Sequence, residues 1–252
     1  MTANIKRNVQ KEMSLQKILC MIFIPSSIMT LVYIITGGLN NVIPSLLLFF
    51  ICAAFTLFPF EIGAVLNASK KLYGGYSLKS AFINYTKMSK LRILLYGTTL
   101  FAFAGIMSVT IAPLENNLFA PISNKLSQSI PAYFDWHNID YYQRYSKGIL
   151  LATCVAYSIL NVIIAPIIEE LFFRGYLTSK ISRYGNFAPL IITILFSSYH
   201  FWLPFNNIFR ISAFFPAALI AWRKKNIYIS IVFHCLCNLL STVSFIISVF
   251  SG

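Results

Sequence analysis

Residues 168–174 read IEELFFR, so two adjacent carboxylates and an arginine sit inside an apolar stretch. Ionisable groups at membrane depth are costly, by roughly 2.5 kcal/mol or more for a central Asp, Lys or Arg. Two further apolar stretches carry histidines, FSSYH at residues 196–200 and HCLCN at residues 234–238. A chain that keeps several such groups in apolar surroundings is expected to use them.

The composition is that of a membrane protein, with 58% hydrophobic and only 11% charged residues among 252. A net charge of +13 would ordinarily suggest a nucleic-acid surface. However, most of the Lys and Arg residues fall in four clusters on alternate sides of the apolar stretches, at residues 6–17, 70–92, 174–183 and 223–225. This positive-inside pattern predicts a multi-pass protein in a lipid bilayer with a cytoplasmic N-terminus, and no nucleic-acid partner.

The apolar stretches predict an all-α bundle of about seven transmembrane helices, judged against the roughly 20 apolar residues that a bilayer requires. They lie at residues 18–37, 42–66, 93–113, 148–177, 187–203, 208–222 and 226–250. The stretch 208–222 fits a span least well, because it contains Arg210 and Pro216. We expect one integral membrane domain, with N-terminal helices in residues 1–147 and a motif-bearing core in residues 148–252.

Two connections between the predicted spans are long. Residues 67–92 are basic, and we expect them on the cytoplasmic membrane surface. Residues 115–147 have balanced charge and are predicted to form an outer loop that rests at the membrane interface. A binding role for this loop is the alternative. The interface prediction depends on its aromatic residues, Tyr133, Phe134, Trp136, Tyr141, Tyr142 and Tyr145.

The two carboxylates differ in their local partners. Residues four apart share one face of a helix, so Glu170 and Arg174 are predicted to pair. Glu169 is rotated by about 100° and has no such partner, which leaves it free to act as a general base. On this interpretation the pair of Glu170 and Arg174 holds the end of the helix in place.

The histidine stretches show the same spacing. His234 and Asn238 are expected side by side, and both can donate hydrogen bonds to a developing oxyanion. Phe196 is expected to pack beneath His200 and limit its rotamers. At about 1.5 Å per residue, Glu169 lies roughly 16 Å deep, His200 roughly 20 Å and His234 roughly 13 to 20 Å, so the clusters can meet in one layer.

Each cluster also has a structural interpretation. The Glu-Glu-Arg cluster alone could be an interfacial charge pair, and a lone His200 could be a hydrogen-bonded packing residue. His234 with Asn238 could hold helices together. The three clusters at matching depth favour a joint functional interpretation.

Together the clusters resemble the motifs of the CAAX-protease and bacteriocin-processing family (CPBP, also called Abi) of intramembrane endopeptidases. Those motifs are Glu-Glu-x-x-x-Arg, Phe-x-x-x-His and His-x-x-x-Asn on consecutive core helices, and the resemblance covers roughly residues 148–245. It implies that Glu169 is the general base and that His200 helps it to activate a water. It also implies that His234 and Asn238 stabilise the oxyanion, while Glu170 and Arg174 have structural or substrate-orienting roles.

The cofactor prediction is that the protein uses none, with zinc as the alternative. Family members have often been labelled metalloendopeptidases, and zinc would be bound by Glu169, His200 and His234. The sequence carries no His-Glu-x-x-His motif, and we favour the version without metal.

The resemblance implies a membrane-associated peptide or protein substrate, as in pheromone or bacteriocin maturation, self-immunity or CAAX-type processing. A composition typical of AT-rich coding sequence suggests a bacterial cell membrane. The alternative is a non-catalytic membrane partner that regulates a sensor kinase or confers bacteriocin immunity. A transporter with Glu169 and His200 as a proton relay is favoured least, because no repeated halves are evident. The sequence indicates no oligomeric state.

Overall fold

The computed structural model describes residues 12–82, 85–131, 134–136 and 138–251. Two of the predictions fall outside them, the N-terminal part of the first basic cluster (residues 6–11) and Tyr133. The described residues form helices and no strand: α2 (Leu15–Thr36), η1 (Gly37–Asn41), α3 (Ser45–Phe55), α4 (Leu57–Tyr73), η2 (Lys79–Ala81), α5 (Lys90–Ser129), η4 (Ile139–Tyr141), α6 (Lys147–Ile159), η5 (Leu160–Ile164), α7 (Ala165–Glu169), η6 (Glu170–Leu177), η7 (Ser182–Tyr184), α8 (Phe187–Ser198), α9 (Asn207–Lys224) and α10 (Tyr228–Ser251).

The predicted all-α membrane bundle is confirmed. Within the described chain, five helical segments are long and apolar enough to cross a membrane, namely 15–41, 45–73, 90–129, 147–177 and 228–251. The other two predicted spans correspond to α8 and α9. The fourth segment is continuous from α6 to η6, and η5 and η6 within it are π-helical. Such wide turns occur frequently at functional sites.

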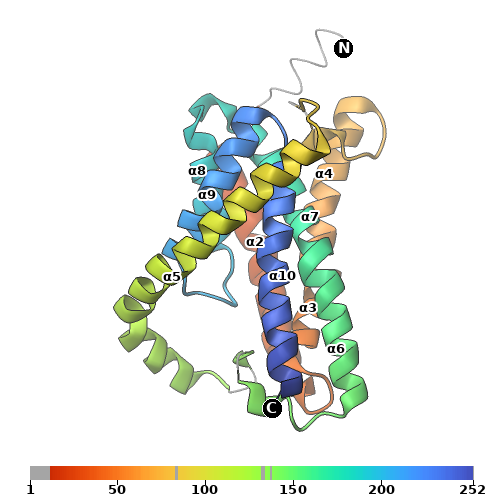
Figure 1. Ribbon diagram of the computed structural model, residues 1–252. Helices are drawn as coiled ribbons and strands as arrows, with labels where there is room; N and C mark the ends of the chain where they lie inside the picture. Colours follow the sequence, from red (N-terminus) through yellow and green to blue (C-terminus); the bar gives the residue numbers. More distant parts are fainter. Residues whose placement is uncertain (1–11, 83–84, 132–133, 137, 252) are drawn as a thin grey trace.

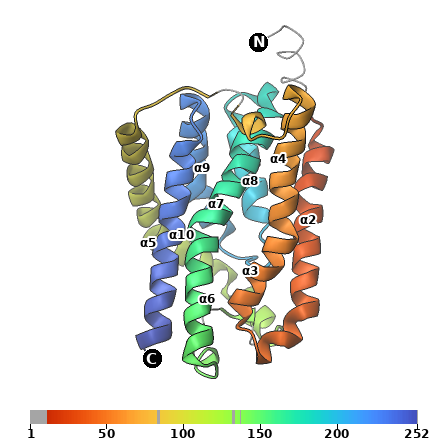
Figure 2. The ribbon, with the colours of Figure 1, turned by 90° about the vertical axis from the view of Figure 1, so that its right-hand side faces the viewer.

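The helices form layers around α10 (Figures 1 and 2). In Figure 2, α5 lies on one side of α10, and the rod of α6 and α7 lies on the other, followed by α3 with α4 and then α2. Helix α9 packs against α5, α8 and α10. Close approach of α5 to α10 depends on Gly97, because a Cβ there would lie 2.5 Å from Val232 Cγ1.

The predicted outer loop at residues 115–147 is wrong in its first half, because α5 continues to Ser129. The helix contains Pro113 and Pro121, which membrane helices tolerate. Beyond Glu115, α5 has no buried residue, and Figure 1 shows this half leaving the bundle. Glu115 itself is buried and accepts hydrogen bonds from the backbone N–H groups of Ile208 (3.0 Å) and Phe209 (2.7 Å) at the start of α9.

The second half of the predicted outer loop packs on the bundle. Trp136 Nε1 donates to the Tyr33 hydroxyl of α2 at 2.9 Å. Arg144 Nη2 donates to the Asn40 carbonyl at 3.0 Å, and Tyr142 is only 2% exposed. The described aromatic residues of this segment therefore make protein contacts that close one end of the bundle.

The basic clusters gather at the opposite end, which we call the basic end (residues 70–92, 180–183 and 223–225). Thr86 N donates to the Lys225 carbonyl at 2.7 Å, and Met13 N donates to the Lys180 carbonyl at 2.9 Å. Glu12 pairs with Arg183 at 2.6 Å, and this hydrogen-bonded guanidinium lowers the pKa of the Glu12 carboxyl. These contacts place three of the four clusters on one side, as the positive-inside pattern predicts.

Helices α8 and α9 form a hairpin whose loop, residues 199–206, does not reach the far end of the bundle (Figure 1). Helix α8 begins beside the basic end and has 12 residues, so it rises only about 18 Å. The loop therefore lies at mid-depth in the bundle, which brings its first residues to the level of Glu169.

Candidate active site

Residues from all three motifs line one cavity of about 720 Å³. Helices α3, α5, α9 and α10 and the 199–206 loop contribute most of its lining, which is rich in aromatic side chains. Five of the predicted site residues line it, Glu169, Phe196, His200, His234 and Asn238. The structure therefore brings together side chains from three segments that lie far apart in the sequence.

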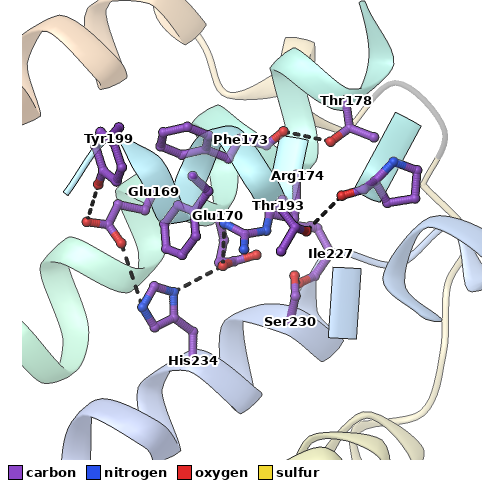
Figure 3. Close-up of polar contacts among 12 residues, drawn as sticks. Glu169, Glu170, Phe173, Arg174, Thr178, Thr193, Tyr199, Ile227, Ser230 and His234 are labelled. Carbon is purple, nitrogen blue, oxygen red and sulfur yellow. Dashed lines mark hydrogen bonds and ion pairs between the residues drawn. The ribbon is translucent and has the colours of Figure 1, made fainter. Parts of the chain in front are cut away.

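Glu169 is the last residue of α7 and is 7% exposed. Its Oε1 accepts a hydrogen bond from the Tyr199 hydroxyl at 2.8 Å. Its Oε2 lies 3.6 Å from His234 Nε2 (Figure 3). The carboxylate is thus oriented from one side and remains open to the cavity.

Glu170 lies in the protein interior with 0% exposure. Its Oε1 lies 3.3 Å from Arg174 Nη1, which confirms the predicted pair. The same oxygen is 3.0 Å from His234 Nδ1 (Figure 3). Glu170 therefore also orients the imidazole, a contact between helices that the spacing along one helix did not reveal.

His234 explains how two adjacent carboxylates serve one site. Glu169 and Glu170 point about 100° apart around their helix. The imidazole stands between them, with Nε2 toward Glu169 and Nδ1 toward Glu170. Because the Glu170 carboxylate can only accept, Nδ1 carries a hydrogen. This contact fixes the orientation of the imidazole ring, with Nε2 toward Glu169.

His200 is held by its own backbone turn. Its Nδ1 lies 2.7 Å from the Phe196 carbonyl, so Nδ1 donates and Nε2 keeps its lone pair. The Phe196 ring packs against the imidazole edge-on at 5.0 Å, as the four-residue spacing predicts. His200 and Glu169 make no direct hydrogen bond, yet both line the cavity.

Asn238 lies one turn beyond His234 but is tied to another helix. Its Nδ2 donates to the Asn161 carbonyl at 2.8 Å and lies 3.4 Å from Asn161 Oδ1. Asn161 Nδ2 in turn donates to Thr242 Oγ1 at 3.0 Å. These contacts join η5 to α10, so Asn238 combines a position on the cavity with a role in helix packing.

The comparisons with known proteins bear on the same segment. Residues 151–240 match a family model described as type II CAAX prenyl endopeptidase Rce1-like. This segment is similar to the Rce1-like family. The comparisons with curated proteins and with solved structures each found no match. The matched segment contains all three motifs, so the resemblance inferred from them is confirmed, and the family that the segment resembles is one of membrane proteases.

Several residues that shape the site were not predicted from the sequence. Tyr199 and Asn161 hold Glu169 and Asn238, but neither has a four-residue relation to its partner. Glu61 of α4 is 1% exposed, and neither of its oxygens has a hydrogen-bond partner in the described chain. It interacts electrostatically with Glu169 and Tyr199. An isolated Glu in the stretch 42–66 was the one available signal for it.

The described residues contain no group of three or more His, Cys, Asp or Glu side chains that could hold a metal ion. His234 Nδ1 contacts Glu170, so Nε2 is the ring nitrogen that faces Glu169.

Proposed function

We propose that the protein is an intramembrane endopeptidase in which Glu169 activates a water for attack on a peptide carbonyl. The observation that carries this proposal is the Glu169 carboxylate itself. It lies on the wall of a large cavity, is oriented by Tyr199, and has His234 Nε2 at 3.6 Å. A positioned carboxylate beside imidazoles supplies the proton acceptor and the hydrogen-bond donors that amide hydrolysis requires.

The reaction can be followed proton by proton. Glu169 takes a proton from a water that His200 Nε2 helps to orient, and the water oxygen bonds to the peptide carbon. The carbonyl oxygen becomes an oxyanion, which accepts hydrogen bonds from His234, when its ring is protonated at Nε2, and from the Asn238 Nδ2 hydrogen that is not donated to the Asn161 carbonyl. Glu169 then gives its proton to the leaving nitrogen as the C–N bond breaks. In this scheme Glu170 and Arg174 orient His234 and do not touch the substrate.

The cavity favours a substrate with apolar side chains. Its lining includes Phe49, Phe101, Phe214 and Trp202 around the polar site. Such a wall suits a membrane-associated peptide or protein segment. CAAX-type processing, peptide maturation and self-immunity all supply substrates of this kind, cleaved near the cytoplasmic leaflet of a bacterial cell membrane.

The proposal is tested by mass spectrometry of peptide ends in membranes that contain the wild-type protein or His234→Ala. We expect a set of new ends with the wild type that is missing with the variant, at equal protein abundance. Identical sets of ends would show that the protein does not hydrolyse peptides through this site, and would favour the non-catalytic partner alternative.

A separate prediction concerns metal. Purified protein, reconstituted in bilayers and exhaustively treated with a chelator, is expected to keep its activity because the proposed steps use only side chains and water. The measurement is the rate of peptide cleavage before and after chelation. Loss of activity that added zinc restores would contradict the proposed mechanism and favour the zinc alternative.

A further inference from the structure

One cation on the cavity wall has no part in the proposed chemistry. Arg210 lies in the first turn of α9, is partly buried, and lines the same cavity as Glu169, His200 and His234. It interacts electrostatically with His200 and Glu169. The hairpin of α8 and α9 thus carries a positive charge into the mid-depth of the bundle, close to the proposed reaction centre.

The contacts of this guanidinium are all with neutral oxygens. Nη1 donates to the Ser197 carbonyl at 2.9 Å and also lies 3.5 Å from Ser197 Oγ and 3.4 Å from Asn207 Oδ1. Nη2 lies 3.4 Å from the carbonyls of Leu203 and Phe205. The positive charge is therefore solvated by the protein but not neutralised.

The nearby carboxylates are committed elsewhere. Glu115 uses both oxygens on the N–H groups of Ile208 and Phe209. Glu169 contacts Tyr199 and His234. Neither forms an ion pair with Arg210, and no other carboxylate in the described part of the chain does. An unpaired charge in a low-dielectric cavity is costly, so its presence calls for an anion that the chain itself does not supply.

A purely structural role explains only part of this arrangement. The carbonyls of the 199–206 loop lie at membrane depth and need donors. A neutral amide side chain could donate to them without bringing a charge into the membrane. A guanidinium, in contrast, presents a planar set of donors that matches a carboxylate in two-point geometry.

We propose that Arg210 binds a carboxylate of the substrate and thereby sets which peptide bond faces Glu169. This inference rests on the proposed function, and it adds a specificity-determining residue. The substrate class it describes is a peptide with apolar side chains for the aromatic wall and one carboxylate for Arg210. That carboxylate is either the C-terminus or an acidic side chain.

The binding step can be measured without hydrolysis. Two of the three tryptophans, Trp136 and Trp202, line the cavity, whereas Trp222 lines a separate pocket at the basic end. In a Trp222→Phe background in nanodiscs, quenching by ω-bromoundecanoate is compared with quenching by ω-bromoundecanamide at mildly alkaline pH. We expect the carboxylate to bind about tenfold more tightly than the amide, since hydrogen bonds to charged groups are the stronger ones.

Variants at Arg210 then test whether this residue causes the preference for the carboxylate probe. Arg210→Gln should make the two probes bind equally, and Arg210→Lys should keep part of the difference because it keeps the charge. Equal binding of both probes to the wild type would overturn the proposal, whether or not Arg210→Gln folds. A carboxylate preference that survives in folded Arg210→Gln would also overturn it.

Two further arms separate this proposal from the proposed function. Glu169→Gln should keep the preference for the carboxylate probe over the amide probe, so the quenching result stands even if no peptide is ever cleaved. With a peptide identified from the membrane ends, amidation of the C-terminus and Glu→Gln or Asp→Asn replacement distinguish the two carboxylate sources. Only the carboxylate that Arg210 binds should lose its effect on KM in Arg210→Gln.

Discussion

Glu169→Gln is expected to abolish measurable peptide cleavage while the protein still accumulates, folded, in the membrane. The amide oxygen can still accept the Tyr199 hydroxyl, which donates to Oε1 at 2.8 Å, so the packing is preserved. The group that takes the proton from water is lost, and general-base catalysis contributes about 10²- to 10⁴-fold. We expect kcat to fall by at least about 10²-fold, measured as the rate of appearance of new peptide ends per mole of reconstituted protein.

A matched control uses the partner of the same carboxylate. Tyr199→Phe removes one hydrogen bond to Glu169 and keeps the ring, which is fully buried. A hydrogen bond to a charged group is worth about 1.5–3 kcal/mol, so a loss of roughly 10- to 10²-fold is expected, whereas Glu169→Gln is expected to leave no measurable cleavage. Undiminished cleavage by Glu169→Gln would show that this carboxylate is not the base.

Glu170→Ala is expected to lower both the stability and the activity of the protein. The substitution strands the buried Arg174, whose Nη1 lies 3.3 Å from Glu170 Oε1, and removes the acceptor for His234 Nδ1. Breaking a buried ion pair by deleting one partner costs about 3–5 kcal/mol. The expected result is reduced abundance and a lower midpoint of thermal unfolding in detergent, together with loss of cleavage.

A double variant separates the two consequences. Glu170→Leu with Arg174→Leu removes both charges and fills similar volumes, and such replacements of buried pairs are often neutral or stabilising. Its thermal midpoint should therefore recover relative to Glu170→Ala. Its activity should not recover, because His234 Nδ1 still lacks its carboxylate. Recovery of both properties would mean that Glu170 serves the fold alone.

The course of the chain through the membrane was largely predictable, because length and hydropathy constrain membrane helices strongly. The exception is instructive. Residues 115–129 contain Pro121 and several polar residues, which by soluble-protein rules indicate a loop. They continue α5, because a helix satisfies the backbone hydrogen bonds of this segment within itself. The segment needs no packing partner for this, and it has no buried residue beyond Glu115. The spacing of apolar residues did not predict the π-helical turns in η5 and η6.

In the site too, contacts within one helix could be predicted from the sequence, whereas contacts between helices could not. The contacts of Glu170 with Arg174 and of Phe196 with His200 follow from helix periodicity, and both were predicted. The bridge made by His234 between two carboxylates depends on how α10 docks against η6, which no one-dimensional pattern encodes. For the same reason the sequence did not connect Asn238 with Asn161. In the sequence, Arg210 was notable only as a charge that made residues 208–222 a poor candidate for a membrane span.

The short helix α8 has a consequence for what can be cut. Its 12 residues end roughly 18 Å along the bundle, and Tyr199 and His200 follow at once, so the proposed cleavage site lies beneath the lipid headgroups. A transmembrane helix offers no free carbonyl at that level, since its amide groups are bonded to one another. A peptide cleaved there has to arrive already unwound, or as a short tail that never formed a helix. For a helical substrate, local unfolding around the cleaved bond therefore has to precede each turnover.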